Sequence, residues 1–214
     1  MKKIFFMVLA LTMIVGVSNA QIVRSNSVKV TKEEGESMWY ARLGLNMMKA
    51  AGDDVEDCNT NIGYQIVWGF EKPLGPCFWG MEFGLGSRGY KVDGDYSNKM
   101  MVHNVVFTPF NIGYKHSFSD EFAVEAHVGP YVAADYFGVL KNVPYYEGKK
   151  VETEDVNIYD LEDYVFPDAG VSFGFGVWYN SIGIDLCLQK GMINWNKDVK
   201  MHTSNFLIRL GFKF

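Results

Sequence analysis

Seven charged or titratable side chains stand singly in this sequence, in segments that otherwise alternate apolar residues with small or uncharged polar ones. They are Arg42, Glu82, Lys115, Glu125, His127, Asp185 and Arg209. If these segments enclose a narrow interior, each charge needs a partner or water, because an isolated buried charge is strongly unfavourable. Acids and bases are both present. The set therefore predicts either a salt-bridge network that fills the interior or a gate along a narrow path for ions, and the narrowness favours the network.

A second possible chemistry is hydrolysis, suggested by "HTSN", His202 to Asn205. A histidine two residues before a serine also occurs in lipid A deacylases, and a serine nucleophile needs such a base. The base is normally oriented by an acid, but no acidic residue follows Ser204 in the chain. The sequence therefore favours rim residues of a loop over a catalytic pair, and we expect no enzyme activity.

Other motifs predict neither a cofactor nor a metal. The stretch "GLGSRG", 84–89, has dinucleotide-binding spacing, but that motif needs a following helix, and here the loop-like "YKVDGDYSNK" follows. The three cysteines, Cys58, Cys77 and Cys187, are odd in number and fit no zinc motif. The acidic stretch 147–163 matches no EF-hand loop, and a solvated surface is the ordinary expectation for it, with binding of divalent cations as the alternative.

The elements that carry these residues are strands, because apolar side chains recur at every second position. Eight such runs occur, at residues 39–47, 61–70, 79–86, 105–118, 121–132, 171–180, 182–189 and 205–214. The fourth run is the least regular. Its apolar parity is assigned to Val106, Phe110 and the even positions that follow, although Val105 and Phe107 then fall on the polar parity.

The connections between the runs alternate between short and long. Short turns are expected at 71–76, at Ser119–Asp120 and at Asn180–Ser181, whereas longer loops are expected near 51–57, at 87–99, near 135–166 and at 190–203. This rhythm is typical of an up-and-down β-barrel whose two ends face different compartments. We therefore predict an all-β fold, an eight-stranded antiparallel barrel.

The composition of the two parities indicates which face points outward. The polar parity is mostly Gly, Ser, Asn and Gln with isolated charges, as expected inside a narrow barrel. The apolar parity is nearly free of charge and rich in Trp, Tyr and Phe near the strand ends, which is typical of aromatic girdles at membrane interfaces. We expect a lipid-facing exterior and a polar interior. The alternative is a soluble lipocalin-like barrel with the two faces exchanged.

The N-terminus and the charge balance agree with export. Residues 1–20 combine Lys2 and Lys3, an apolar stretch and a final "SNA", which predicts a cleaved signal peptide. Without the two lysines, 18 basic residues face 25 acidic ones, a net charge of −7 that argues against nucleic acid as a partner. We expect the barrel at 37–214 and a periplasmic N-terminal segment at 21–36, with an additional inward segment as the alternative for 21–36.

The signal peptide, the eight runs and the aromatic C-terminus resemble small bacterial outer-membrane β-barrels, in particular the PorT-like barrels of Bacteroidetes and the OmpA/OmpX-type architecture. The ending "GFKF" is similar to the signal that the barrel-assembly machinery recognises. The resemblance thus implies an assembly signal at Phe212 and Phe214 and a last strand that closes on the first. It also implies outer-membrane lipid and lipopolysaccharide as surroundings in a Gram-negative bacterium, and a monomer.

Four functions follow in order of preference. The first is a structural or interaction protein that presents acidic extracellular loops for envelope integrity, adhesion or secretion. The second is a narrow channel for ions or small solutes. The third is a lipid A deacylase-like hydrolase using His202 and Ser204, and the fourth is the soluble ligand-binding barrel.

Overall fold

The computed structural model describes residues 37–53, 55, 58–92, 96–146, 149–150 and 155–214. The predicted signal peptide and the segment 21–36 lie outside the described residues. Among the described residues, no helix is long and apolar enough to cross a membrane.

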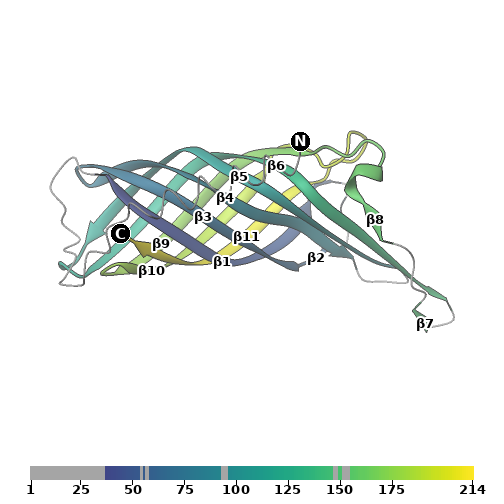
Figure 1. Cartoon of the computed structure of the whole chain (residues 1–214), viewed down its shortest axis with the longest axis horizontal. Coiled ribbons are helices and arrows are strands. Elements are labelled where there is room, and N and C mark those ends of the chain that lie inside the picture. The colour runs from purple at the N-terminus through teal and green to yellow at the C-terminus, as the bar shows by residue number, and fades with distance from the viewer. Residues whose placement is uncertain (1–36, 54, 56–57, 93–95, 147–148, 151–154) are drawn as a thin grey trace, which may run out of the picture.

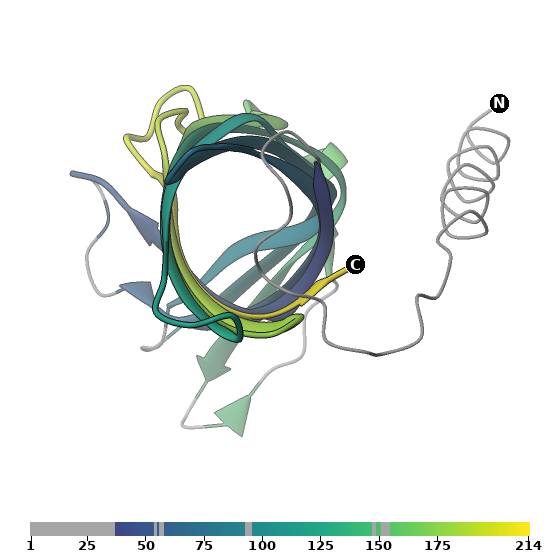
Figure 2. The same ribbon diagram turned by 90° about the vertical axis from the view of Figure 1, so that its left-hand side faces the viewer.

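Eight long antiparallel strands form one closed barrel (Figures 1 and 2). They are β1 (Met38–Ala51), β3 (Asn61–Leu74), β4 (Cys77–Val92), β5 (Tyr96–Ser117), β6 (Phe122–Tyr146), β9 (Pro167–Tyr179), β10 (Ile182–Gly191) and β11 (His202–Lys213). The short elements β2 (Cys58–Asn59), β7 (Lys149–Lys150), β8 (Val156–Asn157) and the 3₁₀ helix η1 (Ile158–Asp160) lie outside the ring. The predicted fold class is confirmed.

The barrel closes where the last long strand pairs with the first. Residues of β11 pair with β1 from Lys213 opposite Tyr40 to His202 opposite Ala51. The C-terminal residue is also held, because the Phe214 amide donates to the carbonyl of Trp39 at 3.0 Å. Strand pairing therefore explains why an alternating, aromatic sequence runs to the end of the chain.

The two ends of the barrel differ. We call the end with the short turns and the C-terminus the turn end, and the other end, which carries the long connections, the loop end (Figure 1). At the turn end, β3 and β4 are joined by Gly75 and Pro76, and β9 and β10 by Asn180 and Ser181. The loop end carries β2, β7, β8 and η1.

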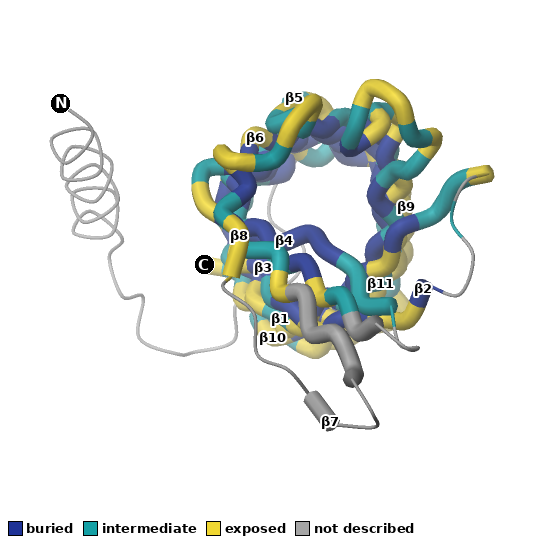
Figure 3. The backbone as a smooth tube through the Cα atoms, turned by 90° about the vertical axis from the view of Figure 1, so that its right-hand side faces the viewer, coloured by how far each residue is buried: buried dark blue, intermediate teal, exposed yellow. Residues whose placement is uncertain are grey.

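Apolar side chains cover the outside of the barrel, and charged ones are buried inside it. Buried and exposed residues alternate along the strands (Figure 3). Ile62 is 65% exposed and Ile184 is 57% exposed, whereas Arg42 and Asp185 are 0% exposed. The sequence alternation is therefore inverted relative to a water-soluble protein, in which exposed apolar patches of this extent are rare.

One predicted orientation is wrong, at Val106. Its side chain is 4% exposed and packs inside the barrel with Val67 and Tyr131, while Val105 and Phe107 alternate with it on the outside. The pairing of β5 with β6 shifts register between Phe107 and Ile112. Such an irregularity changes which parity faces the core, so Phe110 and Ile112 face outward as predicted although Val106 does not.

Two predicted loops are largely strand. The expected loop at 87–99 is shortened because β4 continues to Val92 and β5 begins at Tyr96. Most of the expected loop at 135–166 is replaced by an extension of β6 to Tyr146 and by β7, β8 and η1. These extensions run beyond the ring of eight strands at the loop end (Figure 1). Outside the apolar band both faces of a strand tolerate polar residues, so the alternation that marks the other strands fades there.

The seam between β1 and β11 depends on Gly44. A Cβ at this position would collide with the carbonyl oxygen of Ile208 and lie 2.6 Å from the Cα of Arg209. We predict that Gly44→Val strongly reduces the fraction of barrel that closes, because the seam strands would have to separate. The measurement is the folded, faster-migrating band on unboiled gels after refolding in detergent. Ala41→Val is the control. It places the same valine side chain on the outside of β1, where it does not face the seam backbone, and it should refold normally.

Candidate functional site

The polar interior begins at the turn end and is built around two arginines from the seam strands. Arg42 on β1 donates to Glu82 and, at 2.6 Å, to Glu125. Arg209 on β11 donates to Asp185 at 2.6 Å and pairs with the second oxygen of Glu82 at 3.4 Å. Glu82 therefore links the two guanidinium groups into one network.

Two lysines complete the positive charge of this network. Lys213 Nζ lies 3.2 Å from Glu125 and 3.3 Å from Glu71, and Lys115 pairs with the same two carboxylates. The ammonium of Lys213 also lies 3.7 Å from the ring centroid of Trp178, a favourable cation–π contact in a desolvated site. Each lysine is thus shared between acids.

Charges in this central network balance. Its cations are Arg42, Lys115, Arg209 and Lys213, and its carboxylates are Glu71, Glu82, Glu125 and Asp185. Three of the four cations lie on the seam strands β1 and β11, whereas the carboxylates lie on β3, β4, β6 and β10. Because buried charges are tolerated only when they are paired and hydrogen-bonded, the network is a polar core for the barrel.

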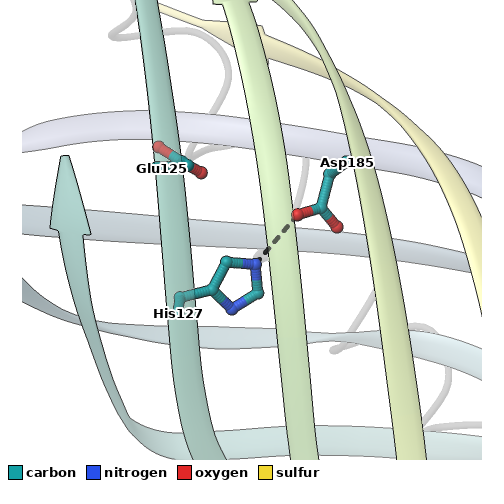
Figure 4. Close-up of side chains that lie close together, drawn as sticks. All are labelled: Glu125, His127 and Asp185. Atoms are coloured by element: carbon teal, nitrogen blue, oxygen red, sulfur yellow. Dashed lines mark hydrogen bonds and ion pairs between the residues drawn. The ribbon is translucent and has the colours of Figure 1, made fainter. Parts of the chain in front are cut away.

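His127 joins the network through Asp185, with 2.8 Å between Nε2 and a carboxylate oxygen (Figure 4). His127, Asp185 and Glu125 offer ligand atoms within 4.8 Å of one another, the kind of donor set that can hold a metal ion. Here both carboxylates already bind guanidinium groups, of Arg209 and Arg42. A divalent cation would have to displace or approach these charges, so the geometry favours ion pairing over metal binding. The expectation of no metal or cofactor remains a prediction.

A second buried ionic cluster lies at the loop end around Arg88. Its guanidinium donates to Asp135 and, at 2.8 Å, to the carbonyl of Val165. Tyr164 donates to the same carboxylate at 2.6 Å. Burial raises the pKa of Tyr164, so its hydroxyl stays protonated and available as that donor. These bonds tie the segment after η1 to the inside of the barrel.

An apolar cluster packs over the same opening. Ile158 and Trp195, from two different connections, are almost fully buried against Met100 and Val102. The Trp195 indole also donates to Thr203 at 3.0 Å. We call this cluster and the Arg88 cluster together the mouth cap.

The structure brings all seven sequence-predicted interior residues into the central network. Several partners were missed, namely Tyr40, Gln65, Glu71, Arg88, Asp135, Asp168 and Lys213. Lys213 lies on the polar parity of its run, and Glu71 continues the polar parity of the run 61–70 into the predicted turn, so alternation is a usable signal for both. Arg88 and Asp135 lie where loops were expected, and nothing in their local sequence indicated an interior position.

His202 and Ser204 both lie on the outward face of β11. The Ser204 hydroxyl lies 2.6 Å from Lys190 Nζ, and in the described part of the chain no carboxylate pairs with His202. The expectation of no enzyme activity remains a prediction. Phe212 is on the outward face of β11 and Phe214 follows that strand. Their role as an assembly signal remains a prediction.

Comparison with known proteins finds similarity only at the level of solved structures. No family model matches the chain, and no curated protein matches it. The chain resembles Ail, the attachment invasion locus protein of Yersinia pestis, with a TM-score of 0.44 and 12% identity over 85% of this chain and 100% of that one. It also resembles Neisserial surface protein A, with a TM-score of 0.46 and 11% identity over 84% and 99% of the two chains.

The N-terminal β-barrel domain of Pseudomonas aeruginosa OprF is more distant, with a TM-score of 0.30 and 6% identity over 81% of this chain and 97% of that one. At these values the similarity is too weak to carry a functional argument. The reasoning about function therefore rests on the geometry of this barrel.

Removing one partner of the central network should destabilise the barrel. We predict that Asp185→Asn lowers the free energy of unfolding by about 3–5 kcal/mol, because Arg209 then keeps a buried charge without its closest acid. The measurement is urea unfolding in lipid vesicles followed by tryptophan fluorescence. Glu162→Gln, which removes an exposed acid of the connection before β9, should change stability by less than about 0.5 kcal/mol.

A double variant shows whether Asp185 and Arg209 stabilise the barrel through their ion pair or through independent packing. Arg209→Met added to Asp185→Asn should recover part of the lost stability, since no buried charge is then left alone at this site. If the two losses simply add, the two residues do not stabilise the barrel as a pair.

Proposed function

We propose that the protein is an integral outer-membrane β-barrel with a structural or interaction role, placed among small bacterial barrels of the PorT-like kind. The observation that carries this proposal is the inverted surface, with apolar side chains outside and paired charges inside. An outward apolar band on a closed barrel suits a lipid environment, because all backbone hydrogen bonds are satisfied between strands.

Outward aromatic residues near the turn end support a membrane position. Neighbouring rings contact one another in a row across β1, β3, β4 and β5, with centroids 5.4, 5.5 and 6.2 Å apart along Trp39, Phe70, Trp79 and Phe110. Rings of this kind are typical of the interface between hydrocarbon and head groups. The turn end would then face the periplasm and the loop end the exterior.

The contents of the barrel favour a structural role over conduction. An ion entering from the loop end would meet the mouth cap first and the central network after it. Both are held by direct side-chain bonds, and an eight-stranded barrel is only wide enough for side chains to fill. We infer that the extended strands at the loop end, with their acidic connections, present the interacting surface of a monomer.

The lower-ranked functions have less support. A soluble lipocalin-like barrel needs an apolar interior, whereas the central network alone places eight paired charges in this one. A lipid hydrolase needs an oriented base beside a nucleophile, whereas Ser204 is bonded to Lys190. The chain is proposed to be exported and inserted by the barrel-assembly machinery through its C-terminal strand.

Cell fractionation and conductance test this proposal together. We expect the protein in the outer membrane, with faster gel migration before boiling than after it, and no steady current steps in planar bilayers. A soluble protein with unchanged migration would contradict the membrane barrel. Steady, salt-dependent current steps from the folded protein, absent from a boiled sample, would establish the channel instead.

A further inference from the structure

Three outward side chains on adjacent strands form a small cationic site at the loop end. Ser204 on β11 pairs with Lys49 on β1 and with Lys190 on β10. All three project from the outside of the barrel, because Asn205, Met48 and Gln189 beside them face inward. Since neighbouring strands lie about 4.8 Å apart, the two lysines start about 10 Å from each other, with the serine between them.

Two ammonium groups and one hydroxyl supply the hydrogen-bond donors of this site. Neither Lys49 nor Lys190 makes an ion pair with any residue that the structure describes. Lys190 Nζ lies 2.6 Å from Ser204 Oγ, and an ammonium can only donate, so the serine oxygen accepts and its own proton is free to point outward. The site thus offers two ammonium groups and one hydroxyl donor to an external acceptor.

The position of the site selects the kind of acceptor. The next outward row toward the turn end consists of Met47, Phe206 and Leu188, which are paired across the same three strands. From this row down to the turn end the outward residues of these strands are apolar. The change from apolar to polar therefore falls at one level on all three strands, with a lysine on β1 and β10 and a serine on β11, where a lipid's acyl chains would give way to its head group.

We propose that Lys49, Ser204 and Lys190 bind the phosphate of a phosphorylated lipid in the outer leaflet, with its acyl chains against Met47, Phe206 and Leu188. This inference rests on the proposed membrane function and assigns a ligand site to it. Phosphate oxygens are strong acceptors that match two ammonium groups, and the apolar row below supplies the contact that free phosphate would lack.

Binding of lipid A tests the proposal. The folded protein in detergent micelles is titrated with bisphosphorylated lipid A and examined by native mass spectrometry. We expect Lys49→Gln/Lys190→Gln to bind about 10- to 30-fold more weakly, since each lysine near an anionic head group contributes on the order of 1 kcal/mol. Lys72→Gln/Lys99→Gln removes the same charge from exposed positions on β3 and β5 and should bind as the unchanged protein does.

Further measurements distinguish lipid phosphate from free phosphate as the ligand. They also distinguish a failure of the binding site from a failure of the proposed membrane barrel. Dephosphorylated lipid should bind the unchanged protein as weakly as phosphorylated lipid binds the double variant, and millimolar inorganic phosphate should not displace lipid A. If Lys49→Gln/Lys190→Gln binds lipid A as tightly as Lys72→Gln/Lys99→Gln does, the proposed site is wrong. If inorganic phosphate displaces lipid A, a lipid is not the specific ligand of the site. Faster gel migration before boiling is checked on every sample, so a failure of the membrane barrel itself is seen separately.

Discussion

The pairing of charges inside a narrow space is the interaction on which this structure depends. Four cations and four carboxylates meet inside the barrel in the central network, and each carboxylate contacts at least one cation. In most proteins an apolar core holds the elements together, but here most apolar side chains of the strands point outward and only small apolar clusters lie inside. The interior is therefore stabilised by a set of ion pairs and hydrogen bonds that is favourable only as a whole.

The overall architecture was predictable from sequence because strand alternation has a period of two and a closed barrel gives every strand the same two environments. The closure of 205–214 on the first run and the inward orientation of Arg42 and Arg209 follow from that rule. It fails at Val106, because a register irregularity between Phe107 and Ile112, in the middle of β5, exchanges the two faces. It also fails in the extensions of β4, β5 and β6, which lie beyond the apolar band.

Which residues belong to the candidate site could be predicted from the sequence, but which of them pair with one another could not. Parity placed seven titratable groups inside, yet it could not show that Glu82 joins both arginines or that Lys115 and Lys213 share two acids. Those contacts depend on the stagger of strands around the barrel, which brings residues far apart in sequence to one level. The mouth cap was harder to predict than the central network, since Tyr164 and Trp195 come from connections whose sequences carry no periodic signal.

The distribution of charge among the strands has a consequence for assembly. The four carboxylates sit on β3, β4, β6 and β10, but three of the four cations sit on β1 and β11. In an open sheet Arg209 already faces Asp185 on the adjacent strand, but its contact with Glu82 and the contact of Lys213 with Glu71 form only when the two edges meet. Joining the edges brings the two halves of the network together, so electrostatic attraction favours closure. A seam slipped by two residues would keep the apolar face outward yet misplace every seam cation, so the charges can select the correct register where hydrophobic alternation alone cannot.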